Sequence, residues 1–156
     1  MNKVLISIAL CSSLAFSYTM DFDRHTDGLV RHLKVYKYPK WVSKIELTNG
    51  KKVFFSSPKS MMEFYHRPGK YSDIGVKSES DFKDILVTDF KTLEPIEARG
   101  AFFVYGSKII SPAGDDLVPF ATYKDAKEFS QKYRGRRILN FKELKNSLIR
   151  LLNGRI

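Results

Sequence analysis

Apolar and polar side chains alternate along short segments in the first half of the chain. Residues 41–47 show this period-two pattern, which is typical of a half-buried strand. Asn49 and Gly50 follow, a dipeptide that favours the type I′ turn of a β-hairpin, and residues 52–55 form the expected return strand. Residues 84–89 are predicted as a third strand.

A helix is predicted between the second and third of these strands. Ser57 is a residue type favoured as an N-cap, and Pro58 is favoured at the first helical position. Apolar side chains continue to Tyr65, and Pro68 with the glycine after it ends the pattern. This half therefore has the order strand, strand, helix, strand.

The second half repeats this order. Residues 101–105 and 117–120 are predicted strands, and Pro119 places the latter at a sheet edge because proline has no N–H to donate. Thr122 opens a capping box that begins a helix, and Gly135 is expected to end it.

The sequence near the end of the chain predicts one more strand and one more helix. Residues 108–110 are interpreted as an extension of the strand before them, and residues 137–139 as the last strand. Asn140 and Glu143 are expected to cap a terminal helix. The apolar stripe of this helix consists of Leu144, Leu148 and Leu151.

The two halves also match residue by residue. Residues 53–59 align with residues 118–124, and residues 63–64 with residues 128–129, at one constant offset and without a gap. A duplicated unit explains this match, and chance similarity between two amphipathic segments is the alternative. We therefore predict an α+β fold in which two duplicated ββαβ units pack together, with an additional C-terminal helix.

The predicted organisation has four parts. In chain order these are a signal peptide at 1–17, an irregular N-terminal tail at 18–34, a first ββαβ unit at 35–93, and a second ββαβ unit with the C-terminal helix at 94–156. The signal peptide has a positive start at Lys3, a short apolar stretch and a small-x-small pattern that ends at Ser17. An uncleaved core helix is the alternative. We expect an exported, periplasmic protein that is cleaved near Ser17.

Composition and charge limit the kinds of partner that this chain is expected to bind. The chain of 156 residues is 43% hydrophobic, which supports a folded core, and its single cysteine, Cys11, rules out a disulfide framework. Its 27 Lys and Arg residues outweigh its 17 Asp and Glu residues, for a formal net charge of +10. In an exported protein we expect this charge to favour an anionic membrane surface or an acidic partner, and not nucleic acid. Solubility alone is the alternative.

Several segments match the order and spacing of one known family. They are Ala98 and residues 101–107, 111–114, 117–121 and 125–129, together with residues 38–42 and 55–58 in the first half. These segments resemble NosL, the copper accessory protein of nitrous oxide reductase. The resemblance implies a pair of ββαβ units, an exported location and copper(I) as cargo. It also implies nitrous oxide reductase or its copper-delivery machinery as partner, and transfer of copper rather than catalysis.

The chain departs from the family at the usual soft ligands. Such proteins have a Cys-Gly-Met ahead of the Tyr-Pro-x-Trp stretch, and the corresponding place here is near Arg31-His32-Leu33. The family also has a methionine between proline and glycine in the loop of the second unit, where this chain has Ala113. A copper(I) site in this chain therefore needs other soft donors.

Copper(I) prefers thioether, thiolate and imidazole donors. Met62 and His66 lie four residues apart on one predicted helix and so share a face. Met61 lies beside them, and His32 or Met20 is expected to supply a further donor from the tail. The alternative is that Met61 and Met62 fill the core and that His66 only ends the helix.

Nothing in the sequence points to an enzyme. Without the signal peptide there is no cysteine nucleophile, the histidines lack the spacing of a helical zinc motif, and no glycine-rich phosphate loop follows a strand. Two function classes remain: a NosL-like copper(I) chaperone, and a metal-free adaptor of the same fold that binds a protein or a membrane through its basic face.

Overall fold

The computed structural model describes residues 18–154, so the predicted signal peptide at 1–17 lies outside the described residues. The regular elements of the first half are β1 (Ser43–Leu47), β2 (Lys52–Phe55), α1 (Pro58–His66), β3 (Phe82–Thr88) and β4 (Pro95–Glu97). Those of the second half are β5 (Phe102–Tyr105), β6 (Leu117–Phe120), α2 (Tyr123–Tyr133), β7 (Arg137–Asn140) and α3 (Asn146–Leu152). Short 3-10 turns connect them at η1 (Val35–Lys37), η2 (Pro68–Ile74), η3 (Glu79–Asp81), η4 (Ala98–Gly100) and η5 (Phe141–Glu143).

The strands form two antiparallel sheets, which confirms the predicted α+β class. The first sheet has the order β2-β1-β3-β4 and the second has the order β6-β5-β7. In each unit the first strand is central, the second strand lies on one side of it, and the strand after the helix lies on the other. The two units therefore share one topology, and β4 is a strand that the sequence pattern did not predict.

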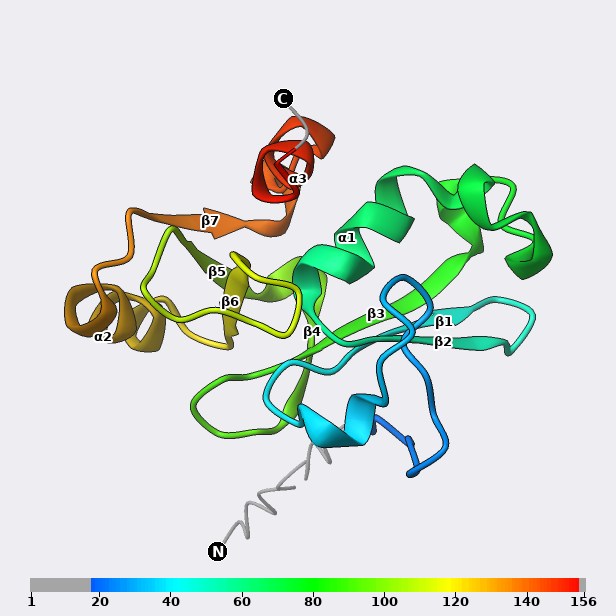
Figure 1. Ribbon diagram of the computed structural model, residues 1–156, viewed down its shortest axis with the longest axis horizontal. Helices are drawn as coiled ribbons and strands as arrows, with labels where there is room; N and C mark the ends of the chain where they lie inside the picture. Colours follow the sequence, from blue (N-terminus) through cyan, green and yellow to red (C-terminus); the bar gives the residue numbers. More distant parts are fainter. Residues whose placement is uncertain (1–17, 155–156) are drawn as a thin grey trace, which may run out of the picture.

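The two long helices begin where the caps predict. Ser57 accepts a hydrogen bond from the Ser60 N–H, and Thr122 accepts one from the Asp125 N–H. Figure 1 shows α1 between the first sheet and α3, and α2 at the far side of the second sheet. No helix within residues 18–154 has the length and apolar character needed to cross a membrane.

Matched phenylalanines pack at equivalent places in the two units. The ring centroids of Phe55 and Phe64 lie 5.5 Å apart, and those of Phe120 and Phe129 lie 5.0 Å apart. All four side chains are buried. Each pair belongs to a different hydrophobic cluster, so each helix is held to its own sheet by the same kind of contact.

The larger hydrophobic cluster joins the two halves. Besides the buried side chains of the first unit, it contains Phe103, Leu117, Leu139, Phe141, Leu144 and Ile149 from the second. The smaller cluster consists of Trp41, Val104, Val118, Phe120, Ala126 and Phe129. The second sheet therefore has two apolar faces, one covered by α2 and the other packed against the first unit.

Several local predictions need correction. Gly50 has a φ of 84° but Asn49 does not have a positive φ, so the hairpin has a turn in which only the glycine is left-handed, not type I′. Residues 108–110 form no strand, and the Ile110 side chain is exposed. Arg134, with a φ of 57°, takes the left-handed position that ends α2. Gly135 serves packing instead, because a Cβ there would lie 2.4 Å from the Val104 side chain.

The C-terminal helix begins later than expected. Asn140 and Glu143 do form a capping box, but it caps the single turn η5, and α3 starts at Asn146. Leu144 is buried ahead of α3, Ile149 is the fully buried residue of α3, Leu148 and Leu152 pack partly against the core, and Leu151 is exposed. The buried face of α3 is therefore centred on Ile149 and does not include Leu151.

The N-terminal tail is irregular but packed against the first unit. The Leu29 N–H donates to the Phe54 carbonyl over 2.8 Å, so the tail lies along β2. Gly28 is buried there, and a Cβ at this position would lie 3.0 Å from the Ser56 nitrogen. This contact brings the charged residues that follow Gly28 close to α1.

Candidate functional site

The two predicted thioether donors lie in the core. Met61 and Met62 are fully buried and belong to the larger hydrophobic cluster. His66 is half-buried at the end of α1, and its Nε2 atom contacts the Leu144 carbonyl oxygen. Because a carbonyl oxygen only accepts, Nε2 carries the proton in this contact and the lone pair of the neutral ring lies on Nδ1.

The predicted donors from the tail are not assembled with α1. His32 is exposed, with a left-handed φ of 53°, and its N–H donates to the Gly28 carbonyl. Met20 is half-buried in a separate part of the tail. Within residues 18–154 no three His, Cys, Asp or Glu side chains are grouped so that they could hold a metal ion.

A buried polar network occupies another face of α1, and the sequence analysis did not identify it. Lys59 and Glu63 lie four residues apart on this helix, and only 1% and 6% of their surfaces are exposed. The Lys59 ammonium donates to the Ala113 carbonyl over 2.7 Å and to the Leu152 carbonyl over 3.2 Å. These bonds tie α1 to the loop before β6 and to the end of α3.

Glu63 is held by two donors from opposite ends of the described chain. The Asn153 side-chain amide donates to a Glu63 carboxylate oxygen over 3.0 Å, and the Arg31 guanidinium lies 3.5 Å from the same oxygen. Arg31 also donates to the Asn153 side-chain oxygen over 2.7 Å. The three side chains thus form a closed triangle.

Asp116 is the second buried carboxylate of this network. It accepts hydrogen bonds from the backbone N–H groups of Lys59 and Leu117, each over 2.8 Å, and from the Ser111 hydroxyl over 2.7 Å. Burial raises the pKa of Asp116 above its ordinary value, although these donors oppose the shift. Burial lowers the pKa of Lys59, and the nearby Asp116 carboxylate opposes that shift.

The network includes both segments at which this chain departs from the resemblance described above. Arg31 lies at the place that corresponds to the Cys-Gly-Met, and Ala113 replaces the loop methionine. Both segments contact the Lys59–Glu63 face of α1. An ammonium and a guanidinium group thus lie at these two places, and positive groups repel a copper ion. The spacing of Lys59 and Glu63 was the sequence signal for this pair.

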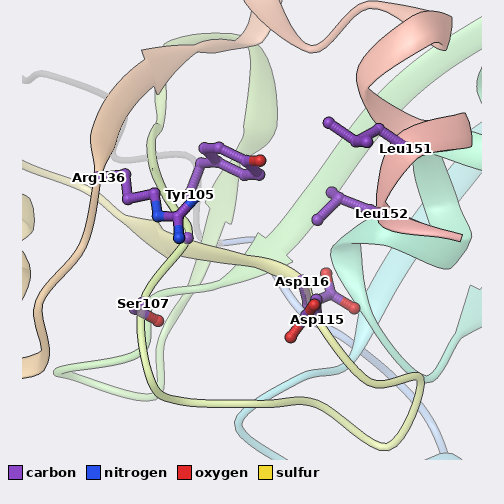
Figure 2. A pocket seen from close by; sticks show the side chains of 8 residues that line it. Tyr105, Ser107, Asp115, Asp116, Arg136, Leu151 and Leu152 are labelled. Atoms are coloured by element: carbon purple, nitrogen blue, oxygen red, sulfur yellow. The ribbon is translucent and has the colours of Figure 1, made fainter. Parts of the chain in front are cut away.

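A cavity of about 450 Å³ opens beside the network. Figure 2 shows Tyr105 and Arg136 on one side of it, Leu151 and Leu152 of α3 on another, and Asp115 and Asp116 at the loop. Leu152 and Asp116 belong to both the cavity wall and the network. Solvent in this cavity therefore lies next to the buried charges, but both Asp116 oxygens are already bonded within the protein.

Comparisons with known proteins agree with this architecture. The crystal structure of the copper chaperone NosL from Shewanella denitrificans superposes with a TM-score of 0.71 at 20% sequence identity, covering 84% of this chain and 98% of that chain. At this identity the likeness shows a common fold. Among curated proteins no sequence matches. The sequence profile of the NosL family matches residues 19–149, nearly the whole described chain. The chain therefore belongs to the NosL family.

Proposed function

We propose that this chain is an exported accessory protein that carries copper(I) as cargo in the maturation of nitrous oxide reductase. The observation that carries the proposal is the family match over residues 19–149. The superposition with the crystal structure of a copper chaperone supports it. The reductase or its copper-delivery machinery is the partner, and the periplasm is the compartment, after cleavage near Ser17.

The proposed donors are Met62 and His66, with Met61 and His32 as additional ligands. His66 supports this choice because its Nδ1 carries the free lone pair of the neutral ring. Met62 is fully buried, so its sulfur must leave the core before it can bind copper. Loading therefore requires the end of α1 to open.

Competition for copper(I) against a chromophoric chelator tests this donor set. The variant Met62→Ile/His66→Gln keeps the apolar bulk and removes both donors. We expect it to lose at least about tenfold in affinity, because the loss of a residue that only hydrogen-bonds to a metal ligand already costs about 10–100-fold. Met20→Ile/His25→Gln makes the same chemical changes in the tail and serves as the matched control. Equal affinities of wild type and Met62→Ile/His66→Gln would rule out these donors.

A second candidate function is a metal-free adaptor of the same fold. The specific observation in its favour is the buried Lys59 ammonium, which donates to the Ala113 carbonyl at the position of the family's loop methionine. Under this alternative the wild type binds no copper(I), yet it still associates with the reductase or its delivery machinery. Co-purification of the periplasmic protein with these partners, with and without a copper chelator, separates the two functions.

A further inference from the structure

A second cavity of about 450 Å³ lies at the C-terminal end of α1, and the proposed copper function does not explain its charges. Its walls come from α1, η3, η4, η5 and the segment before α3. The lining residues are Tyr65, His66, Glu79, Arg99, Phe141, Lys142, Leu144 and Lys145.

Positive side chains dominate the rim of this cavity. Arg99 is fixed in place, since it donates to Glu97 over 3.1 Å and to the Phe82 carbonyl over 3.2 Å. Lys142 and Lys145 are exposed, and neither has a carboxylate within ion-pair distance among residues 18–154. An anion that enters the cavity therefore meets cations whose charges are not fully neutralised.

The one acidic side chain in the wall is already engaged. Glu79 accepts a hydrogen bond from the Tyr65 hydroxyl. Burial, together with this carboxylate, raises the pKa of Tyr65 to about 12, so the hydroxyl remains a donor at neutral pH. Glu143, the acid between the two lysines in sequence, is turned toward Asn140 and Arg137. The net charge at the rim is accordingly positive.

The shape and floor of the cavity favour a protein side chain over a membrane surface. Tyr65 and Phe141 form an edge-to-face pair with centroids 5.3 Å apart, and Leu144 is buried beneath. A flat bilayer cannot enter such a hollow. Large apolar side chains that would insert into lipid are exposed elsewhere within the described residues, and none of them lines this cavity.

The surrounding chain strengthens the positive field. Residues 121–154 contain nine Lys and Arg residues against three acidic ones. Clustered like charges raise the local concentration and the association rate of oppositely charged partners. The cavity thus lies beside a strongly basic part of the described protein.

We infer that this cavity docks an acidic segment of a protein partner, with Asp or Glu carboxylates paired to Arg99, Lys142 and Lys145. The apolar floor would cover the methylene groups of the bound side chain. The inference deepens the partner side of the proposed function and does not depend on copper.

Fluorescence anisotropy with a labelled hexaglutamate peptide tests the inference on the intact exported protein at low salt. The variant Lys142→Glu/Lys145→Glu is compared with Lys124→Glu/Lys127→Glu, which changes the net charge equally on exposed positions of α2. We expect at least about a tenfold loss of affinity for the first variant and less than about a threefold loss for the second. Arg99→Gln should also weaken binding.

Three results would overturn the inference. They are no binding by the wild type, equal losses in the two double variants, and tighter binding of vesicles of phosphatidylglycerol than of the peptide. Circular dichroism of each variant checks that the fold is retained. Peptide binding is measured without copper, and the copper proposal is tested separately with the Met62→Ile/His66→Gln variant, so a failure of one test is distinguishable from a failure of the other.

Discussion

At the scale of single residues, Asp116 shows how burial and hydrogen bonding oppose each other. Its carboxylate is buried, which disfavours the charged form, but it accepts two backbone N–H bonds and a serine hydroxyl. The two N–H groups belong to the start of α1 and the start of β6. Asp116 therefore joins the helix of one unit to the edge strand of the other.

Truncation of Asp116 should destabilise the protein far more than its conversion to the amide. Asp116→Ala leaves the buried N–H groups of Lys59 and Leu117 without an acceptor, and we expect a loss of about 2–4 kcal/mol in the free energy of unfolding. Asp116→Asn keeps an oxygen for both, and its cost should be about 1 kcal/mol. Urea unfolding measures both values. Equal losses would contradict this role of the carboxylate oxygen.

The raised pKa of Asp116 has a defined pH signature. The native state holds this proton more tightly than the unfolded chain, whose pKa is near 3.8. Its contribution to stability is therefore present below pH 3.8 and is lost as the pH rises through the folded value. The stability of the wild type relative to Asp116→Asn should fall over this window. A pH-independent difference, measured by urea unfolding at a series of pH values, would show that the two states share one pKa.

At the scale of elements, the two units are alike in how their long helices begin, because a side-chain oxygen caps each of them. Ser57 is buried and also donates to the Ser60 hydroxyl, whereas Thr122 is exposed. We expect Ser57→Ala to cost about 1–2 kcal/mol and Thr122→Ala about 0.5–1 kcal/mol. The exposed Ser147 within α3 supplies the control, since Ser147→Ala should change stability by less than about 0.5 kcal/mol. Thermal denaturation ranks the three variants, and a cap variant indistinguishable from the control would contradict the prediction.

Elements with local signals were predicted from the sequence, and elements that depend on distant partners were not. Ser57 and Thr122 act within their own first turn, so both helix starts were predicted. Strand β4 is only three residues long and exists because β3 offers it a free edge. The Lys59 bond to Leu152 joins residues 93 positions apart, and no periodic pattern encodes such a contact. The packing role of Gly135 likewise depends on Val104 of another strand.

The candidate site was less accessible to sequence reasoning than the fold. The four-residue spacing of Met62 and His66 is real, but spacing does not say which face of α1 is buried. In the structure the sulfur side faces the core, while Lys59 and Glu63 meet the tail and α3. The tail and the end of α3 pack over Lys59 and Glu63. Only the tertiary structure shows this packing, because these segments are far from α1 in the sequence.

At the scale of the whole molecule, the two units share one core and should unfold together. Leu139 lies in the larger cluster, and Trp41, the single tryptophan, lies in the smaller one. Leu139→Ala should cost about 2–5 kcal/mol. We expect Trp41 fluorescence and far-ultraviolet circular dichroism to shift to the same lower urea midpoint, as in a single cooperative transition. An unchanged Trp41 transition in this variant would show that the clusters unfold independently.

The closed triangle of Arg31, Glu63 and Asn153 joins residues near both ends of the described chain, so it can form only when nearly all of that chain is present. The Lys59 ammonium likewise depends on the Leu152 carbonyl, close to the end of the described chain, for one of its two hydrogen bonds. Before residues 152 and 153 are in place, the buried charges on α1 have fewer hydrogen bonds, and burial of a charge is less favourable with fewer such bonds.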